Sequence, residues 1–397
     1  MKKERVLLYV LAAIQFTHIM DFMIIMPLGD ILMKLFGINP QQFSIIVSSY
    51  AFSAGISGFL SAFFIDRFDR KSALITAYVG FTIGTLACAF APSYLALLLA
   101  RILTGAFGGV LGALVLSIIG DAIPNNRRAS AMGIVMAAFS LASVFGVPFG
   151  LYIAQELSWH APFIFLALAG AIITGVIFWQ VPSMRMHIER KSDRKSPLEI
   201  IKNVVQSKNQ LYALLLMFLL VIGQFSVIPF ITPYMIRNVG FVQEQIPLIY
   251  LIGGALTVFS NPFVGRLADR YGRNRIFTIF LFLSLIPLAI MPNLPPVPIY
   301  VALIVTGSFF VFISGRWVPA STMLTSVVLP QNRGSFMSIS TSVRQLSSAT
   351  ASFMAGIIVI ESSSDSPLER YDYVGYIAIA ASLLAVLVSR KLKMVDE

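Results

Sequence analysis

Asp21 is the one acidic residue of this chain that lies well inside an apolar run, since the others fall in polar stretches, at run ends or in the tails. A charged carboxylate in hydrocarbon costs roughly 2.5 to 3.5 kcal/mol, so it is expected to face a cavity or a charged partner. Such a group can bind a proton reversibly, which makes Asp21 the leading functional candidate. The alternative is a permanent structural carboxylate bonded to an arginine.

Arg101 is the expected partner of Asp21, because the two residues lie at a similar depth in apolar segments that run in opposite directions. Counted from the ends that we assign to the cytoplasm below, Asp21 is about 22 Å deep and Arg101 about 27 Å deep. His18 precedes Asp21 by three residues and shares its helix face. Because histidine titrates near neutral pH, His18 is predicted to share the proton or tune the acid, or else to be a polar helix contact.

Two further arginines, Arg316 and Arg344, also lie inside apolar runs. With Arg101 they outnumber the single acid, which predicts a net positive cavity that accepts a weakly anionic or polar substrate. The alternative for Arg316 is snorkelling to a nearby membrane face, and for Arg344 it is a structural contact with a neighbouring helix. Candidates for hydrogen bonds to a substrate are Gln15, Gln224 and Asn261.

No metal ion or cofactor is predicted. His160 and His187 lie in loops, and the chain shows no cluster with metal-ligand spacing. The single cysteine, Cys88, lies inside an apolar run, so neither a disulfide framework nor a thiolate cluster is expected.

The elements that carry these residues are predicted to be membrane helices. Of 397 residues, 57% are hydrophobic and 12% are charged, and the mean hydropathy is +0.83, whereas soluble domains carry roughly 25% charged residues. The apolar residues form runs of about twenty, the length of a transmembrane helix. The first run continues to about Leu28, too long for a signal peptide, and contains Asp21, so it is predicted to be an uncleaved first helix.

The apolar runs predict an all-α integral membrane protein with twelve transmembrane helices in two sets of six. The first set covers 6–28, 43–65, 73–91, 94–119, 131–154 and 161–181, and the second covers 211–236, 246–265, 275–291, 297–320, 335–360 and 372–390. The predicted domains are an N-terminal six-helix bundle over 1–182, a cytoplasmic linker over 183–210 and a C-terminal six-helix bundle over 211–397.

The basic residues orient these helices. With the N-terminus in the cytoplasm, 23 lysines and arginines fall on the cytoplasmic side, and only Lys34, Arg237 and Arg370 fall on the opposite side. This is the positive-inside pattern, so the net charge of +11 reflects topology and not a nucleic-acid surface. A multi-pass protein of the cell inner membrane with both termini in the cytoplasm is predicted.

Two short matches repeat across the linker, which indicates duplicated halves. The segment 66–70 (DRFDR) returns 203 residues later as 269–273 (DRYGR). The segment 124–127 (PNNR) returns 206 residues later as 330–333 (PQNR). Both pairs lie in predicted cytoplasmic loops at equivalent places in their halves.

The segment 265–273 (GRLADRYGR) resembles the cytoplasmic loop motif of the major facilitator superfamily nearly letter for letter. The equivalent loop of the first half departs from it, with Ala62 and Asp69 where the motif has glycine. It matches the motif at Asp66, Arg67, Arg70 and Lys71. The resemblance covers essentially the whole chain and implies two six-helix bundles.

These two loops are expected to form a charge cluster, because an aspartate among arginines can make contacts in one conformation and break them in another. The cluster is predicted to favour the outward-facing state. Its members are Asp66, Arg67, Arg70, Asp269, Arg270 and Arg273. The alternative is that these residues only hold the loops in the cytoplasm.

Helices 4 and 5 refine the resemblance. The segment 101–109 (RILTGAFGG) is similar to the family's R-x-x-x-G-x-G pattern, and 140–150 (SLASVFGVPFG) to the helix 5 motif of its twelve-helix drug/proton antiporters, although a valine separates glycine from proline. Gly146, Pro148 and Gly150 are predicted to let helix 5 bend and pack closely, sealing the path against proton leak, or else to form an ordinary kinked helix. In the resembled fold, helices 1 and 4 line the cavity.

We therefore expect a secondary transporter that exports a small molecule or drug in exchange for protons, near members that export sugars, nucleosides and chloramphenicol. The alternative is an uncoupled or proton-symport carrier of a polar or anionic metabolite, with Asp21 as a fixed charge. No span offers paired carboxylates, a nucleophile with a base or a phosphate loop, so an enzyme is not predicted, and neither is a receptor. The expected partners are the substrate, protons and membrane lipid, without nucleic acid, and the protein is expected to act as a monomer.

Overall fold

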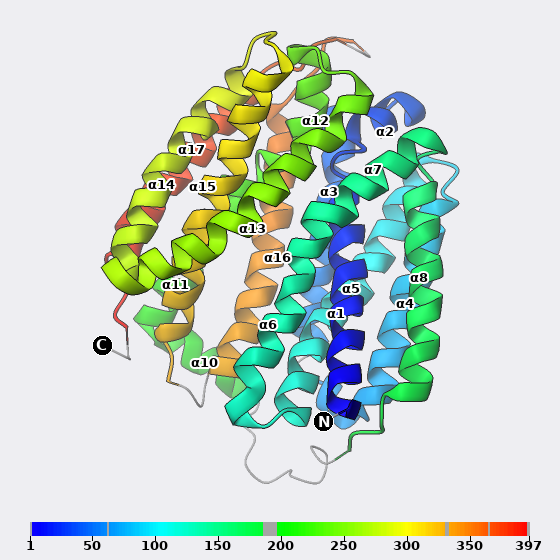
Figure 1. Ribbon diagram of the computed structural model, residues 1–397, viewed down its shortest axis with the longest axis vertical. Helices are drawn as coiled ribbons and strands as arrows, with labels where there is room; N and C mark the ends of the chain where they lie inside the picture. The colour runs from blue at the N-terminus through cyan, green and yellow to red at the C-terminus, as the bar shows by residue number, and fades with distance from the viewer. Residues whose placement is uncertain (1, 62, 186–196, 330–332, 364–365, 395–397) are drawn as a thin grey trace. The chain divides into compact units, whose positions relative to one another are not determined.

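The computed structural model describes residues 2–61, 63–185, 197–329, 333–363 and 366–394, and within these ranges the regular structure is helical apart from one isolated bridge (Figure 1). The α-helices are α1 Lys2–Ile24, α2 Gly29–Phe36, α3 Pro40–Ser61, α4 Arg70–Ala89, α5 Tyr94–Ala122, α6 Asn125–Leu141, α7 Val147–Glu156, α8 Ala161–Gln180, α10 Pro197–Gln206, α11 Lys208–Phe225, α12 Ile231–Tyr234, α13 Ile246–Tyr271, α14 Arg273–Ile290, α15 Ile299–Ser326, α16 Arg333–Ile358 and α17 Tyr371–Ser389. The predicted all-α membrane fold is confirmed.

Eleven helical segments of the described chain are long and apolar enough to cross a membrane. The twelfth predicted span, 335–360, is also a long helix, since α16 has 26 residues. Its hydropathy is low, because serine and threonine recur along it and because it carries Arg344 and Gln345. Hydroxyl side chains are compatible with a bilayer when they bond to the preceding turn, as Ser347 does to Val343 O at 2.6 Å.

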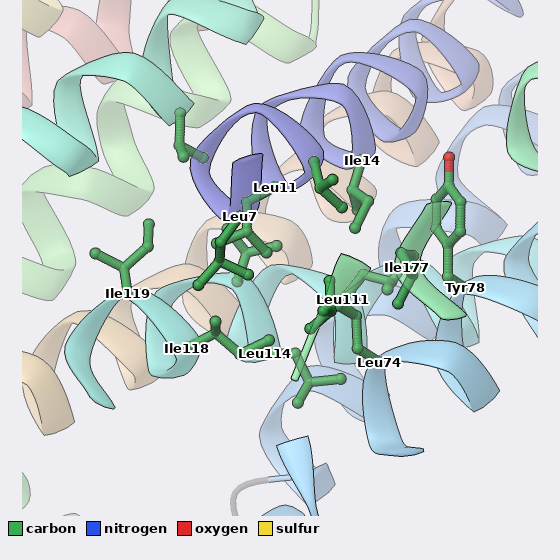
Figure 2. Packing of buried hydrophobic residues seen from close by; sticks show 14 of the residues in the cluster. Leu7, Leu11, Ile14, Leu74, Tyr78, Leu111, Leu114, Ile118, Ile119 and Ile177 are labelled. Atoms are coloured by element: carbon green, nitrogen blue, oxygen red, sulfur yellow. The ribbon is translucent and has the colours of Figure 1, made fainter. Parts of the chain in front are cut away.

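The chain consists of two compact units, and unit 1 comprises 1–25 and 49–199. In its described part α4 packs on α5 and α8, and α1 packs on α6 and α8. Figure 2 shows the core between these helices, to which α1, α4, α5 and α8 contribute the labelled residues Leu7, Leu11, Ile14, Leu74, Tyr78, Leu111, Leu114, Ile118, Ile119 and Ile177. Lipid tails are as apolar as leucine, so such a core is stabilised by close packing rather than by escape from water.

Unit 2 comprises 26–48 and 200–397. Here α15 packs on α13 and α14, and α11 packs on α16 and α17. The segment 26–48 precedes most of unit 1 in sequence but has its contacts in unit 2. The predicted division into 1–182 and 211–397 differs from these units at this segment, and it stays a prediction.

A buried charge cluster attaches the segment 26–48 to unit 2. Arg237 donates from Nε to Asp30 Oδ1 at 2.6 Å and from a terminal nitrogen to Glu361. Lys34 pairs with the same aspartate at 3.2 Å. The Arg237 side chain is only 3% exposed, so removal of either carboxylate would leave a buried cation less well compensated.

Besides the π-helix that interrupts the span predicted at 131–154, which is described with the site below, two regions differ from the predicted helices. The short helix α2 lies between the first two predicted spans, and its eight residues are too few to cross a bilayer. The span predicted at 211–236 is broken into α11, the 3₁₀ helix η4 Ile228–Phe230, α12 and the π-helix η5 Met235–Val239. The break coincides with Pro229 and Pro233, whose nitrogens cannot donate to the preceding turn.

Candidate functional site

Asp21 and Arg101 form a buried ion pair within unit 1. Asp21 lies in the last turn of α1, and its Oδ2 is 2.8 Å from a terminal nitrogen of Arg101. The same nitrogen donates to Asp21 O at 3.2 Å, and Thr85 Oγ1 on α4 donates to Asp21 Oδ1 at 3.1 Å. Both side chains are fully buried, so the structure brings together the two charges that the depth argument paired.

Glycines on α5 bring this helix close to α3. Gly105 and Gly109 follow Arg101 by four and eight residues, which places them on the same side of α5. A Cβ atom at Gly105 would meet the carbonyl oxygen of Tyr50, and one at Gly109 would meet that of Ala54. Only glycine allows this approach, and it places α3 side chains directly beside the arginine.

Tyr50 was not predicted as a site residue. Its ring lies over the guanidinium of Arg101, with the Cζ atom 4.3 Å from the ring centroid, and its side chain is fully buried. A tyrosine inside an apolar run looks like an ordinary core residue in the sequence. Its contact with Arg101 depends on how α3 and α5 are rotated against each other, which no local pattern indicates.

His18 lies beside the ion pair, one turn earlier on α1. Its ring centroid is 5.8 Å from that of Phe81 and 6.3 Å from that of Tyr50, and the residue is 8% exposed. Gly108 of α5 makes room for it, since a Cβ atom there would lie 2.9 Å from His18 Nε2. Gln15 is half-buried one further turn back on α1. The predicted proton-coupling residues therefore gather in one part of unit 1.

The two predicted cavity arginines of the second half have different surroundings. Arg316 is fully buried and donates to Ser284 Oγ at 3.2 Å, to Ser382 Oγ at 2.8 Å and to Leu220 O at 3.3 Å. Its guanidinium is thus bonded to neighbouring helices α14, α17 and α11, and the snorkelling alternative is wrong. Arg344, by contrast, is exposed on α16.

The two predicted substrate amides of unit 2 already accept hydrogen bonds. Gln224 Oε1 accepts from Trp317 Nε1 at 2.7 Å, and Asn261 Oδ1 accepts from Ser314 Oγ at 2.8 Å. Each bond links two helices, so these amides contribute to helix packing in the described state. A role in substrate binding stays a prediction.

The predicted cytoplasmic charge cluster is seen only in parts. Arg70 Nε pairs with Asp121 at 2.9 Å in unit 1, and Arg273 donates to Ser326 Oγ at 3.0 Å in unit 2. Three further members are exposed at their surfaces, namely Arg67, Asp269 and Arg270. The Asp66 side chain lies outside the described residues. A contact between the two loops stays a prediction.

Asp69 stands where the family motif has glycine, and it joins the first loop to the segment after α8. Its carboxylate caps α4 by accepting from Lys71 N at 2.9 Å. It also accepts from the Ser183 hydroxyl and from Met184 N at 3.0 Å, and Arg185 Nε lies 3.5 Å away. Burial alone would raise the pKa of Asp69, but these hydrogen bonds and the arginine together hold it below its usual value.

Asp69→Ala is expected to lower the free energy of unfolding by about 1 kcal/mol, the usual cost of a lost N-cap. Since the folded-state pKa of Asp69 is depressed, its charge stabilises the fold at pH values above its unfolded pKa of about 3.9, and this contribution is lost as the pH falls through the folded value. Unfolding of wild type, Asp69→Ala and Asp69→Asn in detergent between pH 7 and pH 3 measures both effects. A gap between wild type and Asp69→Asn that does not shrink toward low pH contradicts the role of the charge.

The helix predicted at 131–154 is interrupted by a π-helix where its glycines face α1. The π-helix η2 Ala142–Gly146 separates α6 from α7, and Pro148 is the second residue of α7. A Cβ atom at Gly146 would lie 3.2 Å from side-chain atoms of α1, and one at Gly150 would lie 2.7 Å from Ile24 Cδ1. The geometry is thus one of close packing, while a role in blocking proton leak stays a prediction.

Among the residues that the structure describes, no group of three or more histidine, cysteine, aspartate or glutamate side chains could hold a metal ion. Cys88 is buried and its sulfur lies 3.8 Å from Thr104 Oγ1.

Comparison with known proteins agrees with this architecture. The family model described as Major Facilitator Superfamily matches residues 11–352 and 213–395. Over 98% of the chain, the fold is similar to the crystal structure of a bacterial homologue of the human lysosomal transporter Spinster, with a TM-score of 0.78, 16% identity and 97% of that chain covered. It is equally similar to the D-xylose-proton symporter, with a TM-score of 0.78, 16% identity and 98% of each chain covered.

Curated relatives are more similar in sequence. The chain is 25% identical to the uncharacterized transporter YwfA of Bacillus subtilis, over 69% of this chain and 66% of that protein. It is 28% identical to the inner membrane transport protein YdhP of Escherichia coli, over 62% of this chain and 61% of that protein. The chain thus spans just under two thirds of the length of these two relatives.

Proposed function

The chain belongs to the major facilitator superfamily, whose members are secondary transporters and not enzymes, and from this premise we propose that it exports a small molecule in exchange for protons. The observation that carries the proposal is the buried pair of Asp21 and Arg101. A fully buried carboxylate is energetically costly unless it is paired with a cation or protonated. If one conformation of the transporter favours the paired state and another the protonated state, proton binding is coupled to the change of conformation.

The contacts of the pair support a defined role for each residue. Asp21 takes the proton from the outer aqueous phase, which breaks its charge attraction to Arg101 while the bond from the same arginine to Asp21 O is independent of protonation. Thr85 can bond either form of the carboxyl, because a hydroxyl can donate to the charged form and accept from the protonated one. His18, one turn away, tunes the pair through its own charge.

The transport cycle follows from the family. We propose that the halves 1–182 and 211–397, joined by the linker 183–210, alternate between outward-facing and inward-facing states. The charge cluster of the two motif loops stabilises the outward-facing state on the cytoplasmic side. The motifs of helices 4 and 5 favour the drug/proton antiporter branch, and the distribution of basic residues favours an inner membrane location with both termini in the cytoplasm.

A second candidate is a symporter or uncoupled carrier of a polar or anionic metabolite. The observation in its favour is the excess of arginine over acid inside the predicted spans, with Arg101 and Arg316 both fully buried. In this case Asp21 would remain ionised throughout transport, as a fixed partner of Arg101.

A flux experiment with the full chain in proteoliposomes separates the candidates. A thermal-stability screen against chloramphenicol, other drugs, sugars, nucleosides and organic anions first selects compounds that bind, and these are then tested for flux. With the membrane potential clamped to zero, an acidic exterior is expected to expel the compound from the vesicles while the interior acidifies. Acidification of the interior with inward movement of the compound would instead support symport, and flux that ignores the gradient would support an uncoupled carrier.

A further inference from the structure

The Arg101 guanidinium has an unusual environment for a cation in a membrane protein. It is fully buried, and among the described residues Asp21 is the only carboxylate that pairs with it. Its Nε and one terminal nitrogen have no hydrogen-bonding nitrogen or oxygen partner among those residues. When Asp21 is protonated, the ionic attraction is lost. Among the described residues, the cation then has the neutral carboxyl and the backbone carbonyl oxygen of Asp21 as acceptors, together with the aromatic face of Tyr50 and the weakly polar thiol of Cys88.

The contact between Tyr50 and Arg101 is held in place by the backbone of α5. The Tyr50 carbonyl rests against Gly105, and its hydroxyl lies where a Cβ atom of Gly108 would be 2.7 Å away. Arg101, Gly105 and Gly108 are spaced by four and three residues, so they form one face of the helix. Both ends of the tyrosine are thus located by glycines, and its ring cannot turn away from the arginine without losing this fit.

We propose that Tyr50 is a positioning residue of the proposed coupling site: its ring face holds the Arg101 cation while Asp21 is protonated, and so sets the pH at which Asp21 takes up its proton. The ring carries negative charge density on its face, which attracts a cation and repels an anion. It interacts more favourably with a lone guanidinium than with an ion pair, and therefore favours the protonated state of Asp21.

Side chains from several helices surround the ion pair. Tyr50 of α3 lies against Arg101, Thr85 of α4 donates to Asp21, and Cys88 of α4 lies nearby. His18 lies one turn before Asp21 on α1, with its ring near that of Tyr50. Around the neighbouring Met20, helices η2 and α8 contribute the apolar residues Ala142 and Leu166. Among these groups Tyr50 contacts the guanidinium through the face of an aromatic ring. Ring substituents change the negative charge density on that face without changing any formal charge.

This inference rests on the proposed protonation of Asp21, and infrared spectroscopy tests the two separately. The pH dependence of the protonated-carboxyl band is measured on the purified full chain, and the part of the band that Asp21→Asn removes is assigned to Asp21. Tyr50→Phe keeps the aromatic face and is expected to retain the wild-type midpoint. Tyr50→Leu removes the face and is expected to lower the midpoint by about one pH unit, the size of a desolvated cation–π contact.

Fluorinated phenylalanines at position 50 keep the shape of the ring, so they serve if Tyr50→Leu does not fold. One, two and three ring fluorines weaken the negative face in steps, and the midpoint is expected to fall in the same order. Phe163→Leu is the control, because it removes another buried ring of unit 1 that packs on Trp159. Equal midpoints throughout the fluorinated series overturn the role of Tyr50, whereas the absence of any band that Asp21→Asn removes overturns the proposed coupling itself.

Discussion

Asp21→Asn is expected to abolish transport driven by a pH gradient while leaving substrate exchange in place. With one proton exchanged per substrate and no membrane potential, a gradient of one pH unit can support about a tenfold substrate ratio across the membrane. Wild type should approach this ratio in proteoliposomes, and Asp21→Asn should stay near a ratio of one. The reason is that asparagine has a shape close to that of the protonated acid but binds and releases no proton.

Exchange of labelled for unlabelled substrate is the control, since it needs alternating access but no net proton movement. Loss of exchange together with driven transport would mean that the variant is simply inactive, and the coupling role would then lack support. Full gradient-driven transport by Asp21→Asn would refute the coupling role and leave Asp21 as a structural partner of Arg101.

Arg101→Met is expected to be the most destabilising single change at the site. It leaves Asp21 buried without a cation, and loss of one partner of a buried pair costs about 3 to 5 kcal/mol. The double variant with Asp21→Asn and Arg101→Met is expected to recover most of this loss, because neutral side chains of similar size can replace a buried ion pair at little cost. Denaturant or thermal unfolding in detergent measures both.

The single change Asp21→Asn provides the sharper comparison. If protonation of Asp21 is part of the cycle, the protein must tolerate an uncharged group beside Arg101, and Asp21→Asn should cost clearly less than Arg101→Met. Equal losses for the two variants would indicate a permanent structural pair. Arg344→Met is the matched control, since that arginine is exposed on α16 and its replacement should leave the unfolding transition nearly unchanged.

The sequence determines the membrane class, the helices and the central ion pair. A bilayer sets the length of every spanning helix, so apolar runs identify helices without any knowledge of their packing. A single carboxylate within those runs identifies Asp21, and depth along antiparallel helices indicates Arg101, because rise per residue is nearly constant. The same reasoning could not predict α2, which is too short to be recognised as a span.

The tertiary structure decides which side chains meet across helices. Tyr50 over Arg101 and the cluster around Arg237 both join segments whose contact depends on helix rotation and tilt. Gln224 resembles a free substrate ligand in the sequence, yet its amide is occupied by a neighbouring helix. Asp69 appears in the sequence only as a departure from a motif, and its contacts with the segment after α8 make it a cap. The physical reason is that hydropathy records only whether a residue favours lipid, while the partner of each polar group depends on how neighbouring helices are rotated and on where glycine lets two backbones approach.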